Sequence, residues 1–292
     1  MPLLALVMAM ALWASTFVIL KWVFVAVAPL WVICARMWIA ALALLALRKY
    51  WGKADYRAGD WRLFVLMSLA EPCLYFVFEA KALLYTSASQ AGMVTAVLPM
   101  LTVAGAVLFL GEQAGRRLWL GLSMAVAGVI WLSADSVATA AAPNPVLGNS
   151  LEFLAMLCAA LYSLSLKRLS TRYSPLWLTA IQAIAGALFF LPLAWFSTPL
   201  PGQLTLPVAL AMLYLGLGVT LGAYGLYNFA MARLPAARVA VFVNLIPLFS
   251  LLLAWLWLDE RLSMQQILAC ALVLAGVMFS QQNTESVAER QS

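Results

Sequence analysis

Long apolar stretches follow one another along almost the whole chain, separated by short polar segments or by proline and glycine. An α-helix rises about 1.5 Å per residue, so about 20 apolar residues cross the roughly 30 Å hydrocarbon core of a membrane. The pattern therefore predicts ten transmembrane helices, at residues 3–27, 30–47, 61–84, 88–110, 118–134, 151–169, 176–196, 207–231, 236–258 and 262–280.

Composition agrees with this pattern, because 66% of the 292 residues are hydrophobic and only 10% are charged. Soluble domains typically carry about 25% charged residues. We predict an all-α polytopic membrane protein with the lipid bilayer as its main surroundings.

The basic residues predict the orientation of the helices, since short cytoplasmic loops collect lysine and arginine. Most of the 17 lysines and arginines lie in or beside even-numbered loops. These are Arg48, Lys49, Lys53, Arg57, Arg62, Arg116, Arg117, Lys167, Arg168, Arg172, Arg233 and Arg238. Both termini are therefore expected in the cytoplasm, with the protein in the inner membrane of the cell. This bias accounts for the basic excess, so no nucleic-acid partner is expected.

One sixteen-residue pattern occurs twice. VLPMLTVAGAVLFLGE at residues 97–112 is followed 148 residues later by LIPLFSLLLAWLWLDE at 245–260. The same offset aligns Gly128 with Gly276. The chain is thus predicted to contain two five-helix repeats. Because five is odd, the second repeat is expected to be inverted in the membrane, and corresponding loops do carry swapped charge bias.

The predicted organisation follows from this repeat. A first five-helix repeat covers residues 1–135, and a second, inverted one covers 151–280. An extracytoplasmic linker at 136–150 joins them, and a polar cytoplasmic tail occupies 281–292. Inverted repeats are a recurrent architecture of secondary transporters, whose substrate site lies near the midplane where the repeats meet.

Several motifs occur in a characteristic order along both halves of the chain. They are WASTFVILK at 13–21, Arg36 in the second span, and the LP…LGE and IP…LDE segments, each followed by a helix that contains AGV. Together they resemble the drug/metabolite transporter superfamily, in particular its ten-helix exporter branch. The resemblance covers nearly the whole chain. It implies a basket-like bundle around a central cavity that works by alternating access, and it implies export of amino acids or other small metabolites.

Two prolines indicate where a substrate site lies. Pro99 and Pro247 both fall about eleven residues into their spans, roughly 16 Å deep. Each removes an amide donor and obstructs the carbonyl four residues back, at Thr95 and Val243. Paired interruptions in corresponding helices are the best sequence indication of a transporter site. Asn244 lies beside the second interruption and can supply an amide, although harmless kinks would leave the same pattern.

Polar and aromatic residues at similar depth extend the predicted cavity wall. Each one alone is compatible with ordinary helix packing, but as a set they indicate an amphipathic cavity. In the eighth span, Gly218, Gly222 and Gly225 predict a stripe for close helix packing. The complete predicted substrate-binding set is Trp13, Ser15, Thr16, Glu71, Tyr75, Thr95, Pro99, Tyr162, Tyr224, Tyr227, Asn228, Asn244 and Pro247.

Charged residues within a span are costly, at about 2.5 to 3.5 kcal/mol near the bilayer centre, and so indicate function. Lys21, Glu79 and Lys81 are predicted near the outer surface, where Glu79 can pair with either lysine. Arg36, about 9 Å deep, is predicted as a structural anchor or an anion-facing group. Glu71 is the carboxylate predicted near midplane. There it can exchange a proton or bind a substrate ammonium, or remain a protonated donor to the Ser68 carbonyl. Arg36, Glu71 and Glu79 are thus the candidates for charge coupling.

The sequence contains no histidine, which excludes Ser-His and HExxH chemistry. The four cysteines occur singly in different spans without ligand spacing. No enzyme activity, catalytic residue, metal or cofactor is therefore expected. Glu112 and Glu260, which close the two repeated segments, are each expected to offset the positive end of the helix that follows.

We predict a secondary active exporter of small metabolites that functions as a monomer. Amino acids, including aromatic or neutral ones, are the expected substrates. The alternatives are a lipophilic-cation or drug exporter and a phosphorylated-metabolite exchanger, which would need several cationic side chains in the cavity. A channel would need a pore-lining filter sequence, and a membrane scaffold would need no polar groups between the repeats.

Overall fold

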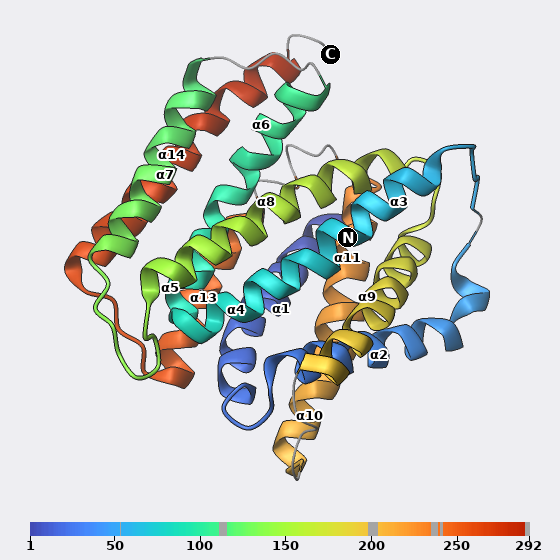
Figure 1. Cartoon of the computed structure of the whole chain (residues 1–292). Coiled ribbons are helices and arrows are strands. Elements are labelled where there is room, and N and C mark those ends of the chain that lie inside the picture. The colour runs from blue at the N-terminus through green and yellow to red at the C-terminus, as the bar shows by residue number, and fades with distance from the viewer. Residues whose placement is uncertain (53, 111–115, 198–203, 235–238, 240–241, 290–292) are drawn as a thin grey trace.

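The computed structural model describes the chain except for residues 53, 111–115, 198–203, 235–238, 240–241 and 290–292 (Figure 1). Up to residue 134 the elements are α1 (Pro2–Val23), α2 (Pro29–Ala46), η1 (Arg48–Tyr50), α3 (Asp60–Ser68), η2 (Leu69–Leu74), α4 (Tyr75–Tyr85), α5 (Ala88–Val94), η3 (Thr95–Val97), α6 (Leu98–Leu110) and α7 (Arg116–Ala134). From residue 145 they are α8 (Pro145–Leu169), α9 (Pro175–Ser197), α10 (Leu206–Tyr214), η4 (Leu215–Ala223), α11 (Tyr224–Met231), α13 (Leu245–Leu258) and α14 (Met264–Glu289). The η2 and η4 segments are π-helical, so α3–η2–α4 and α10–η4–α11 each form one continuous span.

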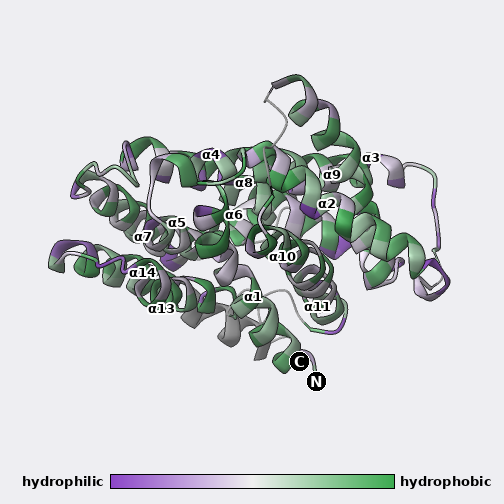
Figure 2. Cartoon of the chain, turned by 90° about the horizontal axis from the view of Figure 1, so that it is seen from below, coloured by the Kyte–Doolittle hydropathy of each residue, from purple (hydrophilic) through white to green (hydrophobic). Residues whose placement is uncertain are grey.

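Seven helical segments of the described chain are long and apolar enough to cross a membrane. They are Pro2–Val23, Pro29–Ala46, Asp60–Tyr85, Ala88–Leu108, Pro145–Leu169, Pro175–Ser197 and Leu206–Met231. Three shorter apolar helices, Trp119–Ala134, Leu245–Leu258 and Met264–Phe279, coincide with the remaining predicted spans. Hydrophobic residues predominate along the helices, and hydrophilic ones gather at peripheral turns (Figure 2). The predicted class, an all-α polytopic membrane protein, is confirmed. The inverted relation of the two repeats stays a prediction.

The most extensive helix packing joins the part of the chain before residue 135 to the part after residue 144. Helix α7 packs against α14, α2 against α9, α4 against α8, and α1 against both α11 and α13. The α7–α14 pair lies to one side of the bundle, whereas α1, α4 and α8 cross its middle (Figure 1). The two parts are therefore interleaved, and the buried core lies between them.

Glycine explains the close approach of α7 and α14. A Cβ at Gly128 would lie 2.6 Å from Val273 Cγ2, and a Cβ at Gly276 would lie 2.6 Å from the Gly121 carbonyl oxygen. These two glycines belong to the two AGV segments, so the repeated motif forms a helix-packing contact.

The glycine stripe predicted in the eighth span is wrong. A Cβ at Gly225 would meet nothing within 4 Å, and one at Gly218 would meet only Tyr214 of its own span, at 3.1 Å. Gly222 comes no closer to another helix than 3.8 Å from Leu12. The close approach occurs instead at Gly216, where a Cβ would lie 2.5 Å from Ile39 Cγ2. The π-helical geometry of η4 changes which face meets α2, which a regular helical spacing could not predict.

Glu260 contacts a different helix start from the one predicted. Its carboxylate accepts hydrogen bonds from the backbone N–H groups of Ala88 and Ser89, at 3.0 and 2.8 Å, and from the Ser89 hydroxyl at 2.5 Å. It thus caps α5 rather than the following helix α14, and a carboxylate is favourable at this positive helix end. Glu112 lies outside the described residues.

Candidate substrate cavity

A break in the span 60–85 turns Glu71 into the bundle. Within the π-helical segment η2, Glu71 leaves the helical conformation, with φ −146° and ψ 120°. Pro72, which has no amide hydrogen to donate, follows it. The Glu71 carboxylate is buried at 5% exposure and accepts a hydrogen bond from the Tyr224 hydroxyl of α11. The break therefore connects a carboxylate on one side of the bundle with a phenol on the other.

A second pair of breaks lies just before Pro99 and Pro247. The helix α5 passes into the short 3-10 segment η3 at Thr95, and α13 begins at Leu245, after a turn at Asn244. Both prolines stand in the first turn of the next helix, where a missing amide hydrogen has no intrahelical partner to lose. The residues before them face the cavity instead: Thr95 and Leu98 from one break, Val243 and Ile246 from the other. These are related pairwise by the 148-residue offset of the repeat.

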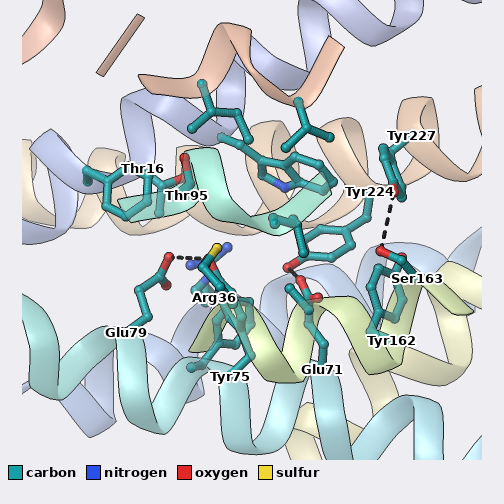
Figure 3. A pocket seen from close by; sticks show the side chains of 18 residues that line it. Thr16, Arg36, Glu71, Tyr75, Glu79, Thr95, Tyr162, Ser163, Tyr224 and Tyr227 are labelled. Carbon is teal, nitrogen blue, oxygen red and sulfur yellow. Dashed lines mark hydrogen bonds between the residues drawn. The ribbon is translucent and has the colours of Figure 1, made fainter. Parts of the chain in front are cut away.

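The breaks surround a cavity with about 570 Å³ of empty space, its open mouth included. Its lining comes from α1, α2, the span 60–85, η3, α6, α8, α11, α13 and the residues just before α13 (Figure 3). The lining residues are Trp13, Thr16, Phe17, Arg36, Glu71, Tyr75, Phe76, Glu79, Thr95, Leu98, Met156, Ala159, Tyr162, Ser163, Tyr224, Tyr227, Val243 and Ile246.

Aromatic rings form one end of this cavity. The Trp13 ring centroid lies 5.2 Å from that of Tyr224 and 4.9 Å from that of Tyr227. The Tyr162 hydroxyl donates to Asn228 Oδ1 at 3.0 Å, and Asn228 Nδ2 in turn donates to Thr179 Oγ1 at 2.8 Å. The hydroxyls of Tyr227 and Ser163 are 3.4 Å apart. This network fixes the rings, which present flat apolar faces to a ligand.

Charged groups form the other end, where Arg36 and Glu79 point toward each other (Figure 3). The Arg36 guanidinium is 1% exposed and lies 4.4 Å over the Phe76 ring, and its Nε donates to Thr220 Oγ1 at 3.1 Å. Glu79 Oε1 accepts from the Tyr75 hydroxyl at 2.9 Å. Among the described residues, Arg36 Nη1 and Glu79 Oε2 have no hydrogen-bond partner, and no ion pair within 4.0 Å joins these two side chains.

The structure brings many of the predicted site residues together at this cavity. Lining it are Trp13, Thr16, Arg36, Glu71, Tyr75, Glu79, Thr95, Tyr162, Tyr224 and Tyr227. The other predicted residues lie outside this lining: Ser15, Pro99, Asn228, Asn244 and Pro247. Ser15 bonds to the Leu12 carbonyl and the Tyr214 hydroxyl, and Asn228 supports Tyr162 from behind. Asn244 is the N-cap residue of α13, with no side-chain cap bond.

The predicted pairing of Glu79 with Lys21 or Lys81 is wrong, because no ion pair joins them among the described residues. Glu79 is 3% exposed, and Lys21 contacts carbonyl groups instead. Lys21 Nζ donates to the carbonyls of Leu83, Thr86 and Ala141, at 2.6, 2.6 and 2.5 Å. Position along a span sets depth but not direction, and the face of α4 that carries Glu79 turns inward.

Sequence reasoning missed the apolar part of the lining, namely Phe17, Phe76, Leu98, Met156, Ala159, Val243 and Ile246. The repeat offset held the signal for Val243 and Ile246, since it relates them to Thr95 and Leu98. The sequence-based prediction also missed Glu152 of α8. This residue is fully buried, and both of its carboxyl oxygens are unpartnered in the described structure, but it lies outside the cavity lining.

Comparison with protein families decides the class of this bundle. The model of the EamA-like transporter family matches residues 1–134 and 146–281. The chain belongs to the EamA-like transporter family. This family lies within the drug/metabolite transporter superfamily, which confirms the resemblance seen in the motifs. The protein is therefore a multi-pass membrane transporter.

Individual relatives cover most of the chain. It is 27% identical to the uncharacterized transporter YetK of Bacillus subtilis, over 83% of this chain and 75% of the relative. It is also 27% identical to a probable terminal-alkyne amino-acid exporter of Streptantibioticus cattleyicolor, over 96% of this chain and 93% of the relative. A solved structure titled only as a crystal structure of a protein matches with a TM-score of 0.71 at 22% identity, covering 97% of both chains. That likeness shows the fold.

Proposed function

We propose that this member of the EamA-like family is a secondary active exporter of amino acids, aromatic or neutral ones among them, that works by alternating access. The observation that carries the proposal is the cavity itself, which combines an aromatic end with two carboxylates and one arginine. An aromatic amino acid carries a partner for each of these: a ring, an ammonium and a carboxylate. The probable amino-acid exporter among the relatives supports the substrate class, and the breaks beside Pro99 and Pro247 support movement about a midplane site.

A lipophilic-cation exporter is the second candidate, favoured by the aromatic rings and by Glu71 and Glu79. A phosphorylated-metabolite exchanger is disfavoured, because Arg36 is the one cationic side chain among the described lining residues. A scaffold is disfavoured by the polar groups that line the cavity.

Flux into proteoliposomes tests the proposal against these alternatives. Liposomes preloaded with unlabelled L-phenylalanine should take up labelled L-phenylalanine faster than empty ones, which is the counterflow expected of a carrier. Tetraphenylphosphonium and phosphoenolpyruvate serve as the alternative substrates. Counterflow with either of these and with no amino acid would reject amino-acid export.

The same proposal includes the orientation of the protein. It lies in the inner membrane, its two five-helix repeats have opposite orientations, and both termini are in the cytoplasm. Cysteines at the exposed positions Ala58 and Thr171 should be protected from an impermeant maleimide in intact cells, and one at Ala140 should react. The four native cysteines are buried and give a low background. Labelling of the cysteine at position 58 together with protection of the one at position 140 would show that the topology is the opposite of the one proposed.

A further inference from the structure

We infer that the cavity recognises both charged groups of a zwitterionic ligand, with the ligand's carboxylate bound by Arg36 and its ammonium bound by Glu79. The inference deepens the proposed function, on which it rests, by assigning the two ends of an α-amino acid to two residues. Its starting point is the pair of unpartnered polar atoms, Arg36 Nη1 and Glu79 Oε2.

Burial makes these unpartnered atoms informative. Arg36 is 1% and Glu79 is 3% exposed, and both line the cavity. A buried charged group without a partner is strongly unfavourable, so such groups are retained where a ligand completes them. The two side chains point toward each other but form no ion pair within 4.0 Å (Figure 3). Each thus keeps bonding capacity that the other does not use.

The bonds already present hold both side chains in place. Thr220 accepts from Arg36 Nε, and the Phe76 ring lies 4.4 Å beneath the guanidinium, which leaves the Nη groups for a carboxylate. The Tyr75 hydroxyl occupies Oε1 of Glu79 at 2.9 Å and leaves Oε2 for a cationic donor. One guanidinium and one carboxylate at the same end of the cavity match the carboxylate and the ammonium that an α-amino acid carries on its Cα.

The remainder of the cavity fits the side chain of such a ligand. Figure 3 shows Arg36 and Glu79 at one end, Tyr162, Ser163 and Tyr227 at the other, and Glu71 with Tyr224 between them. Aromatic faces favour an aromatic or large apolar side chain. The ligand class is therefore a zwitterion with an apolar or aromatic side chain, rather than a simple cation or a simple acid.

Three probes of equal ring size test this assignment: L-phenylalanine, 2-phenylethylamine, which lacks the carboxylate, and 3-phenylpropionate, which lacks the ammonium. Their dissociation constants are measured by titration calorimetry on the purified full-length protein. For the wild type we expect each analogue to bind at least about tenfold more weakly than L-phenylalanine, since a bond to a charged group is lost.

The variants separate recognition from a structural role. Arg36→Gln should weaken L-phenylalanine but leave 2-phenylethylamine nearly unchanged, so the preference for the carboxylate disappears. Glu79→Gln should do the same for the ammonium, leaving 3-phenylpropionate nearly unchanged. Lys81→Gln is the control, because it removes an exposed charge on the same helix as Glu79 but outside the cavity lining, and it should retain both preferences.

Uniform weakening of all three probes in Arg36→Gln and Glu79→Gln would overturn the inference, as would a wild type that binds the analogues as well as L-phenylalanine. The binding measurements test the assignment of Arg36 and Glu79, and the flux measurements test the proposed export, so the two can fail independently. Zwitterion preference without counterflow would reject the proposed export and keep the assignment, whereas counterflow without the preference would keep export and reject the assignment.

Discussion

The spans 60–85 and 206–231 share a backbone design and differ in chemistry. Each is 26 residues long, each is interrupted by a π-helical segment, and each lines the cavity. By the repeat offset, Phe76 corresponds to Tyr224 and Glu79 to Tyr227. The first span thus presents two carboxylates and the second presents none among the described lining residues, and the Tyr224 hydroxyl donates across the cavity to Glu71.

The two interruptions also perform different local tasks. In the first span, Glu71 adopts an extended conformation and its side chain enters the cavity. In the second, the Thr220 hydroxyl donates to the Leu215 carbonyl within η4, at 3.0 Å, and also accepts from Arg36. The same break in the helix thus places an ionisable group in one span and, in the other, holds the neighbouring arginine in position.

The largest expected effect comes from breaking the contact that holds the second span against α2. Gly216→Leu should cost about 1–3 kcal/mol or more by overpacking, because even a Cβ there would lie 2.5 Å from Ile39 Cγ2. The yield of monodisperse protein and its melting temperature in detergent measure the effect. The control is Gly225→Leu in the same span, where a Cβ meets nothing within 4 Å. Equal melting temperatures for the two variants would show that the close approach at Gly216 contributes nothing.

The next effect concerns Glu71, the carboxylate at the break in the first span. We propose that Glu71 couples transport to protons. The other charged and titratable groups of the described cavity lining are Arg36, Glu79, Tyr75, Tyr162, Tyr224 and Tyr227. Glu71→Gln keeps shape but cannot titrate, so it should abolish the pH dependence of L-phenylalanine counterflow. Glu71→Asp should retain it. A Gln variant with the wild-type rate and pH profile would make Glu71 a structural, protonated donor.

The smallest effect separates two phenols of the second span. Tyr224→Phe removes the donor that holds the Glu71 carboxylate in the cavity wall. The released carboxylate disturbs the site, so L-phenylalanine binding should weaken by up to about tenfold. Tyr227→Phe removes only the 3.4 Å contact with Ser163 and should change binding by less than about twofold. Calorimetry on both variants measures the difference. Equal losses would indicate that the phenols act only as aromatic surface.

The spans were predictable because apolar length is a direct consequence of membrane thickness, whereas side-chain direction is not. Counting residues gave Glu79 a depth near the surface, but the bundle covers its face of α4 and Tyr75 bonds to it. Glu152 was missed for another reason. The Asn144 side chain accepts from the Leu147 amide and Pro145 follows at the first helical position, so α8 begins before the predicted start of its span.

The site was predictable where polarity marks depth and unpredictable where packing decides. Trp13, Glu71 and Tyr162 are unusual residues for a span, and all three line the cavity. Pro99 and Pro247 indicated the right places, but the residues of the preceding turns face the cavity. The close contact at Gly216 could not be predicted from a regular helical spacing, because the wider π-helical turn of η4 shifts the face that is presented to α2.

The capping of α5 by Glu260 has a consequence for how the protein is made. A ribosome delivers α5 to the membrane long before Glu260 exists, and the same delay applies to α14 as the partner of α7 and to α9 as the partner of α2. During synthesis the spans before residue 135 therefore lie in the lipid with their main packing faces uncovered until the later spans are inserted. A product truncated before residue 146 would remain in that state, so we expect it to be degraded rather than to act as a half-sized transporter.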